Sequence, residues 1–378
     1  MVVTEEDPFV ELPGALVEEM LSKGELAGDI LYKSYQTIEN DKINMREQLL
    51  KKNLLIRDTD LGYTDIPTTC GIDGSYGIER LVGSDLVACA AVAVEGLTPP
   101  SEKTLWSGPQ HRLFVQPEKH SSNTSALLKA LMMMMETELA VFAQHGIVFL
   151  DGSFETPLIS VNQGVSYIQK DMESDLSSKV YEKFIDFHTS YQEVLRSSRT
   201  DKMWVSMPKY TSKRELGKAL KWPSQYDDRG ILTSVLQPGE VIRPMPLESP
   251  IVNRLNLPYN DRSLENLTND TILALKGIHV MYYKPHKWIP AFRIEISRSI
   301  ANNDIRLASL LQGIKHQCRT ASILEPYPLY LADRMVKHLG KAIPAFRQVT
   351  TRKMIELHQD DLGDIFLNMH AYRSENGR

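Results

Sequence analysis

Cysteine is scarce in this sequence, and the three that occur, Cys70, Cys89 and Cys318, lie far apart. Such a set excludes a disulfide framework and a zinc knuckle built from cysteines. No run of about 18 uncharged apolar residues occurs either, so we expect no transmembrane helix. The N-terminus reads Met-Val-Val-Thr-Glu-Glu-Asp and lacks the basic and then apolar order of a signal peptide. We therefore predict a cytoplasmic protein.

Positive charge is also in the minority, because the formal net charge of the 378 residues is −5. This balance excludes a protein that coats duplex DNA by bulk electrostatics, although it leaves room for a local basic groove. Residues 201–221 carry six Lys or Arg against two acids, and residues 334–353 carry six and no acid. The simpler explanation of either stretch is a solvated surface. A glycine-rich phosphate loop of the Walker type is missing as well, which argues against a P-loop ATPase.

A short phrase occurs twice, as Gly71-Ile72-Asp73-Gly74-Ser75 and as Ile147-Val148-Phe149-Leu150-Asp151-Gly152-Ser153. Each copy places an aspartate at the end of a short apolar run and directly before a glycine. This pattern is typical of a buried strand and the point where the chain leaves it. One copy alone says little, since Asp-Gly is a common turn dipeptide. Two such carboxylates on neighbouring strands can share divalent cations, and Mg²⁺ and Mn²⁺ prefer these ligands.

The elements around the two copies predict a mixed α/β fold. A strand leading into Asp73 is expected first, followed by a central apolar strand at residues 86–94 and a third strand at 104–115. A long helix without glycine or proline then covers residues 125–144, and a last strand at 148–150 leads into Asp151. A strand meander, a crossover helix and a parallel strand bring the first and last strands side by side. The two aspartates are therefore expected to be neighbours.

Both ends of the chain look like helical additions to this core. Residues 14–55 have apolar residues near a heptad spacing, which predicts an amphipathic helix. Proline and tyrosine at 326–328 are expected to begin a helix over 329–339, and residues 243–275 look like surface loops. We divide the chain into an N-terminal helical segment for dimer or partner contact, a central domain and a C-terminal helical extension, at residues 1–60, 61–340 and 341–378.

Hydrolysis of a phosphodiester by two cations about 4 Å apart needs further carboxylates. The helix before Asp151 offers Glu136 and Glu138. We favour Glu138 slightly, because it shares a helical face with apolar residues that should pack on the sheet, and an acid there is either buried at a cost or used. Two solvated acids remain an equal alternative. Asp333, early in the late helix, is a candidate fourth ligand, although the helix dipole alone favours an aspartate there.

At this point the sequence resembles the NurA family, the nucleases that work with the hexameric DNA-pumping ATPase HerA. The matching pieces occur in the family's order and cover roughly residues 65–340. They are the two Asp-Gly-Ser phrases, Lys209 with Ser212, Asp228-Arg229-Gly230 with Pro238-Gly239-Glu240, Phe292-Arg293-Ile294-Glu295, and Pro326-Tyr327-Pro328-Leu329 with Ala332-Asp333.

The resemblance implies an RNase H-like core, a toroidal homodimer and Mn²⁺-dependent DNA cleavage, both endonucleolytic and exonucleolytic. It implies metal binding by Asp73, Asp151 and a glutamate of the preceding helix, and a role for the segment that holds Tyr327 and Asp333. The family commonly has two tyrosine-proline pairs here and then a histidine. This chain has Glu325 in place of the first tyrosine and Asp333 in place of the histidine, and an aspartate cannot act as a neutral imidazole.

Four residues are candidate DNA contacts: Lys209, Lys213, Arg293 and Tyr327. Arg293 lies on the same strand face as Glu295, so a buried ion pair is at least as good an explanation for it. We thus expect a DNA nuclease that uses two Mn²⁺ or Mg²⁺ ions in each site. It is expected to act with a HerA-like ATPase in DNA end processing and repair or in defence against phage. The alternative is a catalytically weak or inactive scaffold that caps the ATPase ring.

Overall fold

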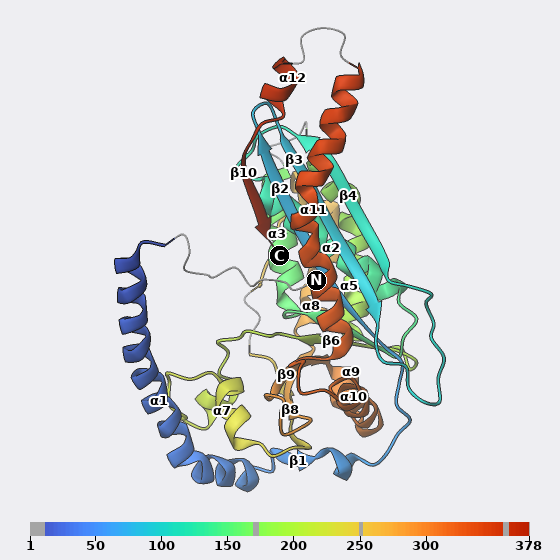
Figure 1. Cartoon of the computed structure of the whole chain (residues 1–378). Helices are drawn as coiled ribbons and strands as arrows, with labels where there is room; N and C mark the ends of the chain where they lie inside the picture. Colours follow the sequence, from blue (N-terminus) through green and yellow to red (C-terminus); the bar gives the residue numbers. More distant parts are fainter. Residues whose placement is uncertain (1–11, 169–173, 249–251, 358–362, 378) are drawn as a thin grey trace.

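A computed structural model describes residues 12–168, 174–248, 252–357 and 363–377. Ten strands of these residues form one sheet in the order β1-β7-β8-β9-β6-β5-β2-β3-β4, and β10 pairs with β2 (Figure 1). The strands are β1 (Leu55–Arg57), β2 (Thr69–Leu81), β3 (Asp85–Glu95), β4 (Gln110–Glu118), β5 (Ile147–Asp151), β6 (Met203–Met207), β7 (Glu240–Pro246), β8 (Ile278–Lys284), β9 (Phe292–Ser297) and β10 (Ala371–Gly377).

The predicted mixed α/β fold is confirmed. β2, β3 and β4 form an antiparallel meander, and β5 then lies parallel to β2 with Ile72 opposite Leu150. The crossover between β4 and β5 is the helix α2 (Thr124–Phe142). β3 follows its apolar run closely and is buried along most of its length, as a central strand should be. β6 extends the parallel part on the far side of β5.

Helices cover both faces of the meander. α2 packs on β2 and β3 from one side, and α3 (Glu155–Ile168) and α5 (Phe184–Arg196) pack against α2. α11 (Tyr327–Leu357) crosses the same two strands from the other side (Figure 1). The remaining helices of four or more residues are α1 (Gly14–Lys51), α4 (Asp175–Glu182), α6 (Glu215–Ala219), α7 (Asp228–Val235), α8 (Glu265–Leu275), α9 (Arg298–Ala301), α10 (Asp304–Gln317) and α12 (Gly363–Asn368).

Three sequence expectations about local structure are wrong. The late helix does not end near residue 339 but continues to Leu357, with Pro344 inside it. The C-terminal extension is not only helical, because β10 pairs antiparallel with the second half of β2. Residues 243–275 contain the end of β7 and all of α8 rather than loops alone. Tertiary packing outweighs the local signal in each case: α11 packs on β2 and β3, β10 pairs with β2, and α8 packs on α5.

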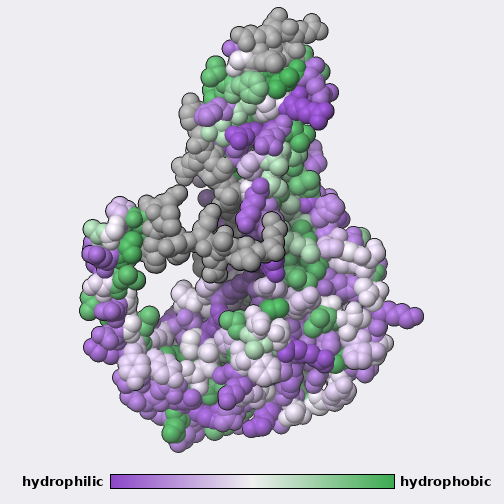
Figure 2. Space-filling model, in the orientation of Figure 1, coloured by the Kyte–Doolittle hydropathy of each residue, from purple (hydrophilic) through white to green (hydrophobic). Residues whose placement is uncertain are grey.

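The N-terminal helix α1 has two parts. Its later residues Ile38, Met45 and Leu49 are buried in a cluster with Trp222 and α7, and Arg46 forms an ion pair with Glu240. The first half stands away from the body at the left of Figure 1, and Figure 2 shows apolar surface along it. Its exposed apolar residues are Leu16, Met20, Leu21, Leu26, Ile30, Leu31, Tyr32 and Tyr35. Among the described residues, no helix is long and apolar enough to cross a membrane.

Candidate metal centre

The fold brings Asp73 and Asp151 together. Ile72 of β2 lies opposite Leu150 of β5, and each aspartate is the next residue along its parallel strand. Asp333 of α11 joins them, since one carboxylate oxygen from each of the three residues lies within 4.8 Å of the others. Asp73 and Asp333 are buried and Asp151 is half-buried. The expected approach of Asp73, Asp151 and an acid of the late helix is therefore present in the structure. The expectation that Asp73 ends its strand is wrong, because β2 continues past it to Leu81, held by its pairing with β3; only Asp151 lies at a strand end.

Gly71 of β2 makes this approach possible. A side chain at Gly71 would lie 2.4 Å from the backbone nitrogen of Leu329, so only glycine lets the first turn of α11 lie directly on β2. Gly71 and Asp73 share a face of the strand, because they are two residues apart. The same close contact therefore sets α11, which carries Asp333, beside the face from which Asp73 projects.

Glu136, not Glu138, lies at this site. A side chain at Gly74 would come within 2.5 Å of Glu136 Oε1, and Glu136 lines one cleft with Asp73 and Asp151. Glu138 is partly exposed on another side of α2, where it forms ion pairs with Arg112 and with Lys183, the latter at 2.8 Å. Burial raises the pKa of Glu138, but these two cations more than offset it and the pKa is lowered. The preference for Glu138 is corrected: the structure does not bring it to the other acids.

The cleft has a volume of about 260 Å³ and is lined by side chains from α2, from the turn after β5 and from the segment after β6. Its lining includes two residues that sequence reasoning missed, Lys129 and Tyr210. Lys129 lies seven residues before Glu136, hence two turns along the same helical face, and this spacing could have revealed it. Tyr210 is 94% exposed and also borders a second, more open cavity of about 630 Å³.

Lys209 occupies the centre of the acidic group. Its Nζ lies 3.1 Å from Asp151 Oδ2, 3.0 Å from Glu325 Oε2 and 3.6 Å from Asp333 Oδ1. Burial lowers the pKa of this ammonium, but the charges of Asp151 and Glu325 more than offset that effect and the pKa is raised. Lys209 is thus held protonated. We refer to Asp73, Glu136, Asp151, Glu325, Asp333 and Lys209 together as the carboxylate cluster.

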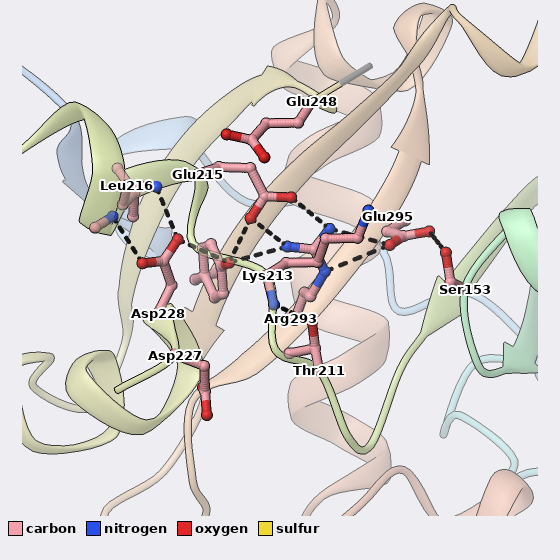
Figure 3. Close-up of polar contacts among 12 residues, drawn as sticks. Ser153, Thr211, Lys213, Glu215, Leu216, Asp227, Asp228, Glu248, Arg293 and Glu295 are labelled. Atoms are coloured by element: carbon pink, nitrogen blue, oxygen red, sulfur yellow. Dashed lines mark hydrogen bonds and ion pairs between the residues drawn. The ribbon is translucent and has the colours of Figure 1, made fainter. Parts of the chain in front are cut away.

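The other candidate DNA contacts differ in accessibility. Lys213 forms an ion pair with Glu155 at 3.2 Å, and Tyr327 is half-buried at the start of α11. Arg293 is only 1% exposed and forms ion pairs with Glu215 at 2.7 Å and with Glu295 at 3.2 Å (Figure 3). A buried guanidinium cannot reach a nucleic acid. The prediction that Arg293 binds DNA is therefore wrong, and the alternative of a buried ion pair is confirmed.

The donor set of the carboxylate cluster suits a hard divalent cation. Mg²⁺ and Mn²⁺ take carboxylate oxygens and water, and they usually bind where few protein ligands leave room for substrate. The protonated Lys209 amine among three carboxylates is a positive charge at the place where such a cation would lie. Asp73, Glu136, Asp151 and Asp333 fit as ligands. Cysteine and histidine are absent from this group, which disfavours zinc.

Comparison with known proteins identifies the family and the fold. The family model of the NurA domain matches residues 67–338. The NurA nuclease from Sulfolobus solfataricus is 15% identical, with a TM-score of 0.50 over 87% of this chain and 99% of that chain. A second NurA structure is 12% identical, with a TM-score of 0.52 over 89% and 99%. A NurA bound to dAMP and manganese is 13% identical, with a TM-score of 0.48 over 85% and 98%.

No curated protein matches the sequence. The two structures with the higher TM-scores share the fold at low identity, and the family match covers most of the chain, including both Asp-Gly-Ser phrases and the start of α11. The match spans residues 67–338, well over half of the sequence, and the chain belongs to the NurA family of nucleases.

Proposed function

We propose that this protein is a metal-dependent DNA nuclease that binds Mn²⁺ or Mg²⁺, as two ions, through Asp73, Glu136, Asp151 and Asp333. The observation that carries the proposal is the convergence of three carboxylates within 4.8 Å beside an open cleft. When bound, such cations supply an activated water and neutralise charge at phosphorus and at the leaving oxygen. Membership of a nuclease family supports a phosphodiester as the substrate.

The remaining residues of the cleft handle the charge of the substrate. Lys129 and Lys209 border the cleft and can donate hydrogen bonds to phosphate oxygens. Arg229 holds the segment after β6 in place, since its guanidinium donates hydrogen bonds to the carbonyl oxygens of Lys209 and Ala291. Lys213 lies further along the same segment and is a weaker candidate for the DNA backbone. Both endonucleolytic and exonucleolytic cleavage are compatible with a cleft that is open to solvent.

A direct test is cleavage of linear and circular DNA with Mn²⁺, with Mg²⁺ or with EDTA. We expect metal-dependent cleavage that Asp73→Ala and Asp151→Ala each reduce to background, because each removes a ligand. Near-full activity in either folded variant would contradict the proposed site. No cleavage under any condition, with a stable ATPase complex still forming, would favour the scaffold, an alternative that rests on Glu325 and Asp333 standing where the family commonly has tyrosine and histidine.

We further infer that a HerA-like hexameric ATPase delivers the DNA, that the protein acts as a homodimer in the cytoplasm, and that it serves in DNA end processing or phage defence. The net charge of −5 supports delivery by a partner, since the chain has no bulk attraction for DNA. The exposed apolar residues in the first half of α1 support an interface there, because such residues in a contiguous stretch usually mark an interaction site.

Two truncations separate this interface from the core. Deletion of residues 1–30 should abolish dimerisation or ATPase capture and leave the melting temperature nearly unchanged. Deletion of residues 1–55 should also destabilise the fold, because it removes the buried Met45 and Leu49 and part of β1. Mass by light scattering and capture by a HerA-like ATPase are the measurements. If the shorter truncation retains both the mass and the capture, the first half of α1 is not the interface.

A further inference from the structure

Glu295 lies behind the turn that carries Asp151, outside the cleft. It is fully buried on β9, and its Oε2 accepts a hydrogen bond from Ser153 Oγ at 2.8 Å (Figure 3). The same oxygen accepts a hydrogen bond from the Phe154 amide at 2.9 Å. Ser153 and Phe154 follow directly on Asp151-Gly152. The carboxylate of Glu295 therefore holds the chain at the point where it turns from β5 into α3.

The other oxygen of Glu295 is held from the opposite side. Glu295 Oε1 accepts from Arg293 Nη2 at 3.2 Å, and Arg293 donates in turn to both oxygens of Glu215, at 2.7 and 2.8 Å. Arg293 Nη1 also lies 3.0 Å from the Tyr282 hydroxyl. The Tyr282 hydroxyl in turn lies 3.5 Å from Asp228 Oδ2. We call Glu215, Asp228, Tyr282, Arg293 and Glu295 the Arg293 network. Because Arg293 is bound at both ends, the orientation of the Glu295 carboxylate is fixed.

Two residues that lie opposite each other on β6 and β9 both bind the turn that follows Asp151. Ser206 of β6 lies opposite Glu295 of β9. The Ser206 hydroxyl donates to the Gly152 carbonyl oxygen, while Glu295 binds the next two residues. Gly152 has a φ of +79°, which favours glycine, and its amide donates to Asp151 Oδ1 at 2.8 Å. The turn therefore sets the direction of the Asp151 carboxylate.

We propose that Glu295 is a positioning residue of the metal centre: it fixes the Gly152–Phe154 turn and so holds the Asp151 carboxylate in the orientation that binds the cation, with Arg293 and Glu215 orienting Glu295. This inference rests on the proposed function. Hydrogen-bonded partners behind metal-binding carboxylates orient them, and their loss typically weakens metal binding by about 10- to 100-fold.

Simple fold stability does not explain the choice of a charged pair here. Well-packed apolar residues of similar volume often replace a buried ion pair without loss of stability. The hydrogen bonds of Glu295 require an acceptor at each carboxylate oxygen, because Ser153 Oγ and the Phe154 amide donate to Oε2 and Arg293 donates to Oε1. A glutamine offers one acceptor and one donor end. In either orientation Glu295→Gln must therefore turn an amide N–H₂ toward donors and lose one side of the arrangement.

The test is Mn²⁺ binding by the full-length protein without DNA, measured by titration calorimetry, with melting temperature as the check on folding. We expect Glu295→Gln and Ser153→Ala each to weaken Mn²⁺ binding by about 10- to 100-fold. Tyr283→Phe is the matched control, because it also removes a buried hydroxyl-to-carboxylate hydrogen bond, to Asp58 at 2.9 Å, but has no contact with the turn. It should bind Mn²⁺ as the wild type does.

Several results would overturn the inference. One is that Ser153→Ala and Glu295→Gln both fold and bind Mn²⁺ with the affinity of the wild type. If only Ser153→Ala folds, its Mn²⁺ affinity alone tests the inference. Another is an equal loss in Tyr283→Phe, which would show general loosening of the fold. If the wild type binds no Mn²⁺ at all, the proposed function fails and this inference fails with it. If the wild type binds Mn²⁺ and Asp151→Ala does not, the proposed function stands while the variants decide the positioning role.

Discussion

Two groups of acidic residues lie on either side of the turn at Asp151–Ser153, and they are held in different ways. In the Arg293 network, the guanidinium binds Glu215 through two hydrogen bonds and also pairs with Glu295, and all three side chains are buried. In the carboxylate cluster, the recorded ion pairs come from the flexible side chains of Lys209 and Lys337, and the cluster opens onto a cleft.

The difference shows which acids are structural and which are available to a ligand. Arginine presents a planar fork that matches carboxylates and is weakly hydrated, so it suits a permanent buried pair. Lysine is a compact charge on a mobile chain and can be displaced at small cost. An acid bound by a buried arginine is therefore part of the framework. Acids gathered around a partly exposed lysine at a cleft remain accessible to a divalent cation.

The largest effect that would sharpen this comparison is on stability. Arg293→Met should lower the free energy of unfolding by about 3–5 kcal/mol, because it leaves Glu215 and Glu295 buried without their cation. Arg199→Met, which removes a partly exposed ion pair with Asp201 at 2.7 Å, should change stability little. Urea unfolding measures both. If both variants lose an equally small free energy of unfolding, the Arg293 network does not stabilise the fold as proposed.

Activity should separate the two glutamates of α2. Glu136→Gln should reduce metal-dependent DNA cleavage by about 100-fold, a loss typical of removing an oriented group at a metal site. Glu138→Gln should remain close to wild type, since it affects only a partly exposed pair with Arg112 and Lys183. Initial rates at saturating Mn²⁺ decide the question. A larger loss in Glu138→Gln would restore the sequence-based preference and remove Glu136 from the cluster.

The pH dependence of stability tests the far end of the Arg293 network. Burial raises the pKa of Asp228 from its ordinary 3.8 to about 6, although amides of Leu216 and Gly217 oppose the shift. The folded state binds this proton more tightly than the unfolded chain does. Its contribution to stability is therefore complete below about pH 4 and declines by up to about 3 kcal/mol as the pH rises through 6.

The Asp228 effect is isolated by comparing urea unfolding of the wild type and Asp228→Asn between pH 4 and 7. Glu215 lies in the same network and contributes in the opposite sense, because burial would raise its pKa but Arg293 more than offsets this and lowers it. Glu215 is present in both proteins, so subtracting one curve of unfolding free energy against pH from the other cancels its contribution. A difference that does not change with pH would mean that Asp228 ionises in the folded protein at its ordinary pKa.

The smallest expected effect concerns Lys209. Lys209→Met should tighten Mn²⁺ binding by about 3- to 10-fold, because it removes a positive charge that competes for the same carboxylates. DNA cleavage should nevertheless decrease, since a contact to phosphate is lost. Lys213→Met is the control for Mn²⁺ affinity, because Lys213 pairs with Glu155 outside the cluster. Unchanged or weaker Mn²⁺ binding in Lys209→Met would show that the lysine does not occupy the cation's place.

Sequence reasoning succeeded where the signal is local. Each aspartate of the pair follows an apolar run and precedes a glycine, and the order of strands and helix between them allows only a few topologies. It failed on Glu136 and Glu138 because α2 is buried around most of its circumference, with Met132–Met135 all inside. A helix that is apolar nearly all round has no distinct face from which its orientation on the sheet can be read.

The sequence by itself determined the mixed α/β core, the pairing of Asp73 with Asp151 and the resemblance to the NurA family, because these depend on short patterns and their order. Only the tertiary structure decided that Glu136 faces the cleft, that Arg293 is buried, that Lys209 lies among the acids and that β10 completes the edge of β2. Each of these depends on contacts between residues far apart in the chain, and the free energy of such contacts is not written in any local pattern.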